Sequence, residues 1–557
     1  MDEERKRPWV RHWPLVAAVV VLSAVVAGVF LLCLRADGGR FVYVIDDIYI
    51  ALAVARNFVV HRVWGVTPYE FSSNESTIIW PLLLALTYAL GGTSELAPLL
   101  LNIVVGGATL LVVYTILRKT GIAPRYQMAT LVAVIFLAPL PAMIFTGMEH
   151  TLQIGSTILI VYVAARDLAG EKGARVGASR ALWVLAAFVP LVRYEGLFLV
   201  FAVCLLFFAR RRWVEAMGLG AVAATPLAIY GAISAYHGWY SLPNSILMKA
   251  NIPVAIGHLR SLPPFGNWDG WVRSFAVWAP GLALLMLLVL LMLLVLLVYR
   301  NGTLWTEGSI MIVLFSITAG LHLKLARLGL FFRYEAYLVA LSLVVFAVGA
   351  YEYLSARRAR TSNRRETLLA AGWLGYSLAC LVIMLGLRGY LSLSRIPRAS
   401  HNIYEQQYQM GLFLRQYYRG ASIAANDIGA VSYLGEPHLE DLWGLGSLDV
   451  AKLRIAGGLT PQLIDQITKA KGTRIAILFD GIFYSGNAGR GGLPPQWIRV
   501  GRWKMFDNYL CFEDTVSFYA VDSAEESALI AHLREFATRL PHEVEQTGKY
   551  MQPDGAK

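Results

Sequence analysis

The run PLVAAVVVLSAVVAGVFLLCL, from Pro14 to Leu34, has no charged side chain and decides the class of the fold. Roughly 20 apolar residues are enough for a helix to cross the hydrocarbon core of a bilayer. The whole chain shares this character, because 57% of its 557 residues are hydrophobic, 15% are charged and the mean hydropathy is +0.54. A soluble domain carries about 25% charged residues. The sequence therefore predicts an α-helical polytopic membrane protein.

Further apolar segments bring the expected number of transmembrane helices to about eleven, several of them short. The segments are Pro14–Leu34, Ala97–Leu117, Met128–Phe145, Thr151–Ala165, Ala181–Leu191, Gly196–Ala209, Val214–Tyr236, Ser274–Val298, Ser309–Leu325, Tyr334–Gly349 and Leu368–Leu387. Another apolar stretch, Ser76–Leu90, is short and contains Pro81, so we expect an interfacial or re-entrant helix there rather than a full span.

Basic residues set the expected orientation, because cytoplasmic loops carry an excess of Lys and Arg. If Ser76–Leu90 is not a span, every basic cluster falls on the cytoplasmic side, and so does the N-terminus. The clusters are Arg5–Arg11, Arg118–Arg125, Arg166–Arg180, Arg210–Arg212, Arg300 and Arg357–Arg365. The first span is too long for a cleaved signal peptide and lacks a small-residue cleavage site, so it is expected to be an anchor. Most polar turns near membrane depth then converge on the outer face of the cell membrane.

The chain is expected to have two domains. Residues 1–387 form the transmembrane module, and residues 388–557 form an extracytoplasmic soluble α/β domain. Within the second domain, Ile423–Asn426, Arg474–Phe479 and Val516–Val521 have the pattern of buried strands. Pro461–Ala470 and Ser523–Leu540 have the pattern of amphipathic helices.

The net charge of +12 does not indicate nucleic acid as a partner, because the basic residues stand in short clusters between apolar spans. Three of the four cysteines, Cys33, Cys204 and Cys380, lie in apolar spans, and Cys511 stands alone in the polar part. We therefore expect neither a disulfide framework nor a cysteine metal cluster.

Two adjacent carboxylates, Asp46 and Asp47, follow the first span. Ionised groups at a membrane boundary are expensive and mark candidate functional sites. On a helix that starts here, Asp46, Tyr49 and Arg56 share a face. A carboxylate at the head of such a helix can act as a general base. The structural alternative is a helix N-cap, for which Asp is a favoured residue.

Two outer turns carry further charged residues. Glu149 and His150 lie between two spans, where they could orient a catalytic group or simply cap a helix. Arg193 and Glu195 interrupt an apolar run, so they must pair or reach water. There are two alternatives. Arg193 faces a phosphate and Glu195 holds the arginine in position, or Arg193 and Glu195 form an ion pair that satisfies both charges.

Cations of two more outer segments complete the candidate site. Asn244 and Lys249 lie in the longest outer loop, and Arg333 and Tyr334 form a second outer turn. Snorkelling to the interface explains one such cation. Several outer cations around an acidic pair are typical of a pocket for an anionic lipid head group.

The order of these motifs resembles the GT-C superfamily of integral-membrane glycosyltransferases, nearest the branch of mycobacterial terminal arabinofuranosyltransferases (AftB-like). The matching segments, in chain order, are Asp46–Ile50, Thr146–Glu149, Arg193–Gly196, Pro243–Lys249, Arg333–Tyr334, and Asp427–Tyr433 followed by Asp441–Leu445. The segment Phe71–Trp80 departs from the corresponding Gly-Tyr/Thr-Thr-Asn/Ser-x-Leu-Trp motif of the family.

The resemblance implies a sugar donor carried on polyprenyl phosphate and a glycan, lipid or protein acceptor in the cell envelope, with transfer usually inverting the anomeric carbon. The sugar is a pentofuranose such as arabinose, or a hexose. By similarity Asp46 is the catalytic base and Asp47 supports it or contacts the acceptor. Arg193, Lys249 and Arg333 are the candidates for binding the donor phosphate. No cofactor or metal is expected, although the pair Asp46–Asp47 could hold the divalent ion that related oligosaccharyltransferases use.

Two rival functions belong to other classes. A multi-pass lipid or sugar transporter or flippase would scatter polar residues through the bilayer and show repeat symmetry, and neither is evident. A non-catalytic glycan-binding protein of the same fold would not need the intact pair Asp46–Asp47.

Overall fold

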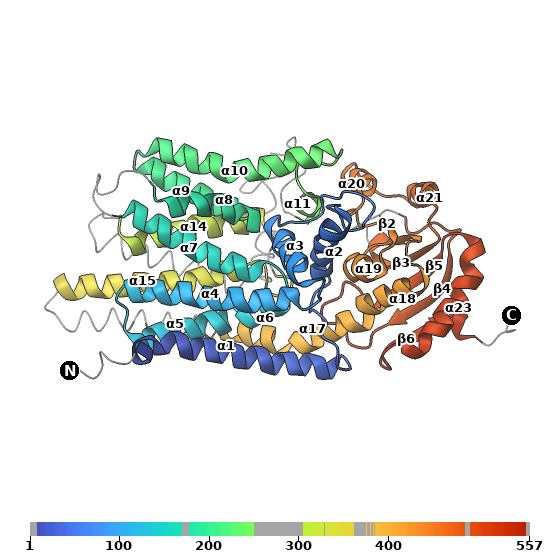
Figure 1. Ribbon diagram of the computed structural model, residues 1–557, viewed down its shortest axis with the longest axis horizontal. Coiled ribbons are helices and arrows are strands. Elements are labelled where there is room, and N and C mark those ends of the chain that lie inside the picture. The colour runs from blue at the N-terminus through green and yellow to red at the C-terminus, as the bar shows by residue number, and fades with distance from the viewer. Residues whose placement is uncertain are drawn as a thin grey trace. The chain divides into compact units, whose positions relative to one another are not determined.

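The computed structural model describes residues 8–169, 178–249, 305–327, 329–360, 385–484 and 491–552, together with residues 372, 375, 379, 382 and 383. One expected span, Ser274–Val298, and most of another, Leu368–Leu387, lie outside the described residues. Figure 1 shows the course of the chain.

The chain divides into two compact units, and each draws on separate stretches of sequence. The first, here called the helical unit, comprises Met1–Gly28, Leu99–Ile229 and Ala250–Ser394. The second, here called the mixed unit, comprises Val29–Pro98, Tyr230–Lys249 and Arg395–Lys557. The domain boundary expected between residues 387 and 388 stays a prediction.

Long apolar helices build the helical unit. The helices are α1 (Pro8–Ala36), which continues into the mixed unit, α4 (Ala97–Lys119), α5 (Pro124–Leu137), α6 (Leu140–Phe145), α7 (His150–Leu168), α8 (Arg180–Val192), α9 (Gly196–Ala209), α10 (Trp213–Tyr236), α14 (Glu307–Leu325) and α15 (Ala336–Arg360). Helix α7 packs against α8, α14 and α15. The segment expected as one span over Met128–Phe145 is instead two helices, because Pro139 and Pro141 interrupt the helical hydrogen bonding.

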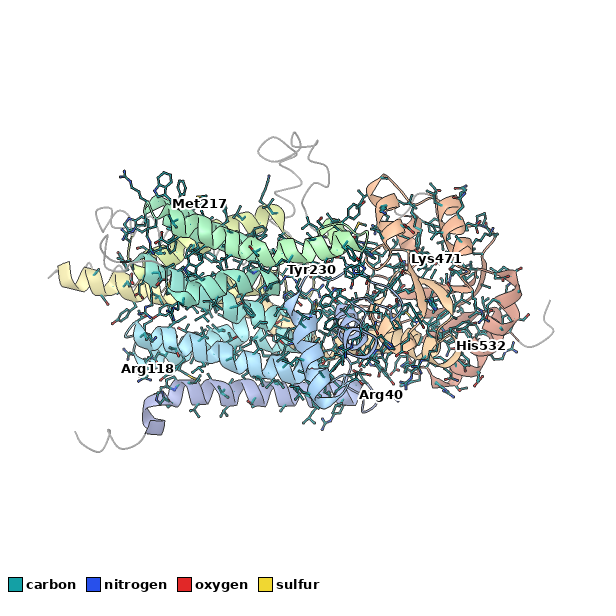
Figure 2. The ribbon with its side chains drawn as sticks, turned by 45° about the horizontal axis from the view of Figure 1, so that its top comes forward. Arg40, Arg118, Met217, Tyr230, Lys471 and His532 are labelled. Atoms are coloured by element: carbon teal, nitrogen blue, oxygen red, sulfur yellow. The ribbon has the colours of Figure 1, made fainter. Side chains whose placement is uncertain are left out.

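Five described helices are long and apolar enough to cross a membrane: His12–Ala36 of α1, α4, α10, α14 and Ala336–Ala356 of α15. Three of them, α1, α4 and α10, expose large apolar side chains: on α10 Val214 is 82% exposed and Met217, labelled in Figure 2, is 73% exposed. Large exposed apolar patches are rare on soluble monomers and fit a lipid environment. The protein is therefore a polytopic membrane protein, while the count of about eleven spans and the sidedness of the termini stay predictions.

A six-stranded sheet is the centre of the mixed unit. Its strands are β1 (Ser422–Ala425), β2 (His438–Asp441), β3 (Ile475–Leu478), β4 (Ile498–Lys504), β5 (Thr515–Ala520) and β6 (Glu545–Gly548). The order is β2-β1-β3-β5-β4-β6. Strand β1 is parallel to β2 and β3, and the remaining neighbours are antiparallel.

Short helices make up the rest of the mixed unit. They are α2 (Asp47–His61), α3 (Ile79–Gly91), α11 (Asn244–Lys249), α17 (Ile396–Ile403), the π-helix Tyr404–Tyr408, α18 (Gln409–Tyr417), α19 (Gly429–Gly435), α20 (Leu448–Ile455), α21 (Pro461–Ala470), α22 (Gly481–Tyr484), α23 (Glu526–Phe536) and three 3₁₀ turns, Ser523–Glu525, Ala537–Arg539 and Lys549–Met551. Helix α3 has 13 residues and is therefore about 20 Å long, short of the hydrocarbon thickness.

Candidate active site

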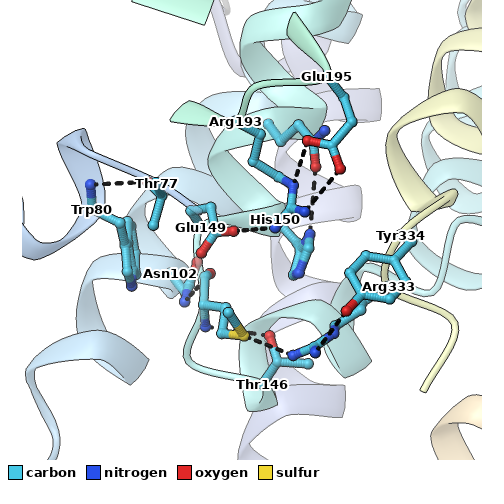
Figure 3. Close-up of polar contacts among 12 residues, drawn as sticks. Thr77, Trp80, Asn102, Thr146, Glu149, His150, Arg193, Glu195, Arg333 and Tyr334 are labelled. Carbon is cyan, nitrogen blue, oxygen red and sulfur yellow. Dashed lines mark hydrogen bonds and ion pairs between the residues drawn. The ribbon is translucent and has the colours of Figure 1, made fainter. Parts of the chain in front are cut away.

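Arg193 is the centre of a buried charged cluster in the helical unit (Figure 3). Its Nη1 donates to Glu149 Oε1 at 2.5 Å. Its Nε and Nη2 donate to the two carboxylate oxygens of Glu195, at 3.1 and 2.8 Å. Arg193 is 5% exposed and Glu149 is fully buried. The ion pair anticipated between Arg193 and Glu195 is therefore present, and Glu149 joins it.

Three helix ends place these side chains. Arg193 follows the last residue of α8 with extended backbone, at φ −156° and ψ 144°. Glu195 precedes α9, and Glu149 precedes α7. A Cβ on Gly196 would lie 2.7 Å from the carbonyl of Val189, so the tight return of the chain requires glycine there. Backbone packing therefore explains the glycine of the Arg-x-Glu-Gly pattern.

The charges in the cluster stabilise one another. Burial lowers the pKa of Arg193, but Glu195 and Glu149 more than compensate and raise it above its ordinary value. Burial raises the pKa of Glu195, but Arg193 outweighs burial and lowers it below the ordinary range. Arg193 and Glu195 are thus held in their charged forms.

The ring of Tyr334 contacts two guanidinium groups. The Cζ atoms of Arg193 and Arg333 lie 5.6 and 4.9 Å from its centroid, within the range of cation–π attraction. Arg333 is 1% exposed and donates to Met148 Sδ at 2.8 Å and to the Tyr334 hydroxyl at 3.2 Å. The ring of His150, fully buried, stands edge-on to Tyr334 at 6.2 Å. Six residues singled out from sequence, Glu149, His150, Arg193, Glu195, Arg333 and Tyr334, therefore belong to one cluster.

A strained turn presents Arg333 and Tyr334. Leu330, Phe331 and Phe332 have φ of 44°, 56° and 60°, the left-handed region that non-glycine residues avoid. Each such residue costs on the order of 1–3 kcal/mol, and this strain tends to occur at functional sites.

A buried ion pair missed by the sequence reasoning holds this turn. Glu335 Oε2 accepts from Gly329 N at 2.9 Å, and Glu335 Oε1 pairs with Arg388 Nη2 at 3.0 Å. Arg388 Nη2 also donates to the carbonyl of Phe332 at 2.7 Å. The signal in the sequence was Glu335 itself, an acid directly after two candidate site residues.

Asp46 occupies a different setting, in the mixed unit. Its Oδ2 accepts from Gly429 N at 2.6 Å and its Oδ1 from Ala430 N at 2.8 Å, so the carboxylate lies at the first residues of α19. Its side chain makes no capping hydrogen bond to its own helix, α2. The cap weighed as a structural alternative therefore exists, but on a helix that begins 383 residues later.

A second acid shares the setting of Asp46. Burial first, and then the charge of Asp427 and a hydrogen bond to it, raise the pKa of Asp46 well above its ordinary value, against the opposing backbone hydrogen bonds. Asp427 Oδ2 accepts from Gln407 Nε2 at 2.9 Å. The approach is so close that a Cβ on Gly429 would lie 2.6 Å from Asp46 Cγ. The Asp-x-Gly-Ala motif therefore supplies both the neighbouring acid and the glycine that admits Asp46.

Three further candidates in the mixed unit form hydrogen bonds with the backbone of other segments. Tyr49 is fully buried, and its hydroxyl accepts from Tyr43 N at 3.4 Å. Arg56 donates to the carbonyl of Tyr433 at 2.7 Å and pairs with Glu436 at 2.9 Å. Asn244, also fully buried, donates to the carbonyl of Gly444 at 2.9 Å.

Two candidates are less defined. Asp47 is half-buried at the first position of α2. Lys249 ends α11, and its side chain lies outside the described residues. Among the described residues, one group of three His, Cys, Asp or Glu side chains is close enough to share a metal ion, and it includes neither Asp46 nor Asp47.

Comparison with known proteins gives the following similarities. A family model described as a domain of unknown function, DUF8728, matches residues 401–519. None of the curated proteins compared with the chain matches it. Among solved structures, ArnT from Cupriavidus metallidurans bound to undecaprenyl phosphate is 13% identical, over 91% of this chain and 98% of that chain, with a TM-score of 0.49.

Two further structures are similar. ArnT of the same organism in the apo state is 13% identical over 91% of this chain and 99% of that chain, with a TM-score of 0.45. The Archaeoglobus fulgidus oligosaccharyltransferase in complex with Zn and sulfate is 11% identical over 88% of this chain and 73% of that chain, with a TM-score of 0.42.

Proposed function

We propose that the chain is an integral-membrane glycosyltransferase that takes its sugar, a pentose or a hexose, from a polyprenyl-phosphate donor. The observation that carries the proposal is the pair of buried guanidinium groups, Arg193 and Arg333, on one tyrosine ring. Buried arginines are the groups best suited to bind a phosphate, since their planar forks match its oxygens. The motif order that resembles the GT-C superfamily supports the same reading.

Arg333 is our candidate for binding the donor phosphate. Two carboxylates accept hydrogen bonds from Arg193. Arg333 donates to the thioether of Met148 and to the hydroxyl of Tyr334, and these two contacts orient its N–H groups. In this proposal Arg333 binds the phosphate oxygens, and the ion pair of Arg193 fixes Tyr334 beside it.

Asp46 is the proposed general base. Its raised pKa brings it nearer to neutrality, where a base removes a proton more effectively. Each carboxylate oxygen has a second lone pair besides the one that accepts a backbone N–H. The base takes the proton of the acceptor hydroxyl while the hydroxyl oxygen bonds to the anomeric carbon. The bond from that carbon to the phosphate oxygen breaks, the configuration inverts, and the phosphate leaves with the electron pair.

The acceptor in this proposal is a glycan, lipid or protein of the cell envelope, reached from the outer face of the membrane. The part of the chain from residue 388 onward is on that face, and the N-terminus is cytoplasmic. This sidedness follows from the distribution of basic residues.

The test is sugar transfer by the purified full chain in lipid vesicles. The donors are synthetic polyprenyl phosphates carrying labelled arabinofuranose or a labelled hexose, with an envelope extract as acceptor. We expect transfer from one of them, and Asp46→Asn should reduce its rate roughly 10²–10⁴-fold, the usual contribution of a general base. The matched control is Asp449→Asn, the same change on an exposed aspartate of the mixed unit.

Donor binding separates the two roles. Arg333→Gln should weaken binding of the polyprenyl phosphate, whereas Asp46→Asn should leave that binding unchanged. Wild-type protein that transfers no sugar from any such donor would remove the enzyme proposal. A folded Asp46→Asn protein with the wild-type rate would remove Asp46 as the base.

A further inference from the structure

His401, Glu405 and Glu543 form a cluster in the mixed unit that the proposed reaction does not use. One ligand atom from each side chain lies within 4.8 Å of the others. His401 lies in the last turn of α17, Glu405 lies in the π-helix Tyr404–Tyr408, and Glu543 precedes β6. We propose that these three side chains bind one divalent transition-metal ion, with Zn²⁺ as the preferred ion.

The spacing of the donors fits a tetrahedral ion. His401 Nε2 lies 3.5 Å from Glu405 Oε1. Two ligands at the usual Zn²⁺ distances of about 2.0–2.2 Å stand about 3.4 Å apart in a tetrahedron. His401 and Glu405 are four residues apart on continuous helical backbone, so both project from one face.

The second, independent observation is the partner of the other imidazole nitrogen. Asp37 is fully buried, and its Oδ1 lies 3.1 Å from His401 Nδ1. The hydroxyl of Ser400 donates to Asp37 Oδ2 at 2.6 Å and fixes that carboxylate. A carboxylate on one nitrogen of a metal-binding histidine sets the tautomer that presents the other nitrogen to the metal.

The donor set and the local charge favour a transition metal. Three carboxylates, of Asp37, Glu405 and Glu543, surround a single imidazole, so a divalent cation would relieve their repulsion. An imidazole ligand favours Zn²⁺ over Ca²⁺ or Mg²⁺, which take oxygen ligands.

The metal would join two separate stretches of the mixed unit, the helix before the sheet and the segment before β6, and Asp37 after α1 would hold His401 in place. Because metal that binds only the folded state adds its binding free energy to folding, the site would stabilise this unit. The inference does not depend on the proposed glycosyltransferase activity.

The test is metal binding by the full chain, purified in detergent with a tag that contains no histidine and stripped with a chelator. Equilibrium dialysis against Zn²⁺, followed by elemental analysis, should give one Zn²⁺ per chain. Glu543→Gln lies on an exposed segment and should fold normally, yet weaken binding at least about tenfold. The control is Glu545→Gln, the same change two residues away, which should bind as wild type does.

Thermal unfolding supplies a second measurement. Zn²⁺ should raise the midpoint for wild type and for Glu545→Gln, but much less for Glu543→Gln. Asp37→Asn should weaken Zn²⁺ binding by roughly 10–100-fold through the orientation of His401. The proposal is overturned if wild type binds less than one Zn²⁺ per chain, if Glu543→Gln binds as tightly as wild type, or if Ca²⁺ competes equally.

Discussion

The two units bury charged groups in opposite ways. In the helical unit the carboxylate of Glu195 meets Arg193 in a two-point ion pair, and its pKa is lowered. In the mixed unit the carboxylate of Asp46 meets backbone N–H groups and a second acid, and its pKa is raised. Of the two, Glu195 is therefore stabilised in its charged form, whereas the setting of Asp46 favours the protonated form.

The largest stability effect should come from removing the cation of the helical unit. Arg193→Met leaves Glu149 and Glu195 buried without their partner, which should cost about 3–5 kcal/mol. The measurement is thermal or denaturant unfolding of the purified protein. The control is Arg419→Met, since Arg419 pairs with Glu436 while 66% exposed and should contribute less than about 1 kcal/mol.

A triple variant sharpens this result. Arg193→Met with Glu149→Gln and Glu195→Gln removes all three charges, so most of the lost stability should return. If the triple variant is as unstable as the single one, packing rather than charge explains the loss.

The next largest effect is a pH dependence of stability caused by the buried carboxylate of Glu440. Burial raises the pKa of Glu440 to about 7, and Lys471 (labelled in Figure 2), 3.9 Å away, only partly offsets it. The unfolded chain loses this proton at lower pH than the folded one, so stability should fall as pH rises from about 4.5 to about 7. At about 1.4 kcal/mol for each pKa unit, the fall is about 3 kcal/mol.

Glu440→Gln is the variant that tests this pH dependence. Its stability should change less than that of wild type over this pH range and exceed it at pH 8, measured by unfolding at several pH values. Glu70→Gln, on an exposed side chain, should follow the wild-type curve. Parallel curves for wild type and Glu440→Gln would contradict the assignment.

A smaller loss of stability is expected on changing Gly429, whose backbone N–H donates to Asp46. Gly429→Ala places a methyl group against Asp46 and should cost about 1–3 kcal/mol, the usual range for overpacking. It should also reduce sugar transfer, because it moves the proposed base. Gly91→Ala in the same unit is a useful comparison, since a Cβ there would meet no other atom within 4 Å. Equal transfer by Gly429→Ala and wild type would show that the position of Asp46 is not critical.

Apolar runs made part of the fold predictable. The strands expected at Ile423–Asn426, Arg474–Phe479 and Val516–Val521 are confirmed as β1, β3 and β5, and the helix at Pro461–Ala470 is confirmed with the same ends. The other strands lack that signal: β2 carries the acids Glu440 and Asp441, β6 is a polar edge, and the register of β4 shifts between Arg499 and Gly501. A shift in register breaks the alternation on which strand prediction depends.

The candidate site was predictable as a set of residues but not as a geometry. Arg193 and Glu195 are two positions apart, so their pairing was one of two stated alternatives. The contact of Arg193 with Glu149 spans 44 residues, and that of Arg333 with Met148 spans 185. Pattern in a single sequence carries no information about such distant partners, which depend on how the helices pack.

The hydrogen bonds from Gly429 and Ala430 to Asp46 also fix the order of events during synthesis. A ribosome adds roughly 5–20 residues each second, so the 383 residues between Asp46 and Gly429 take about 20 to 80 s to make. During that time the segment between Asp46 and Gly429, which includes all but one of the expected spans, leaves the ribosome. The contact of Asp46 with α19 can form only afterwards. The mixed unit is therefore completed last, although its first residues are among the earliest to leave the ribosome.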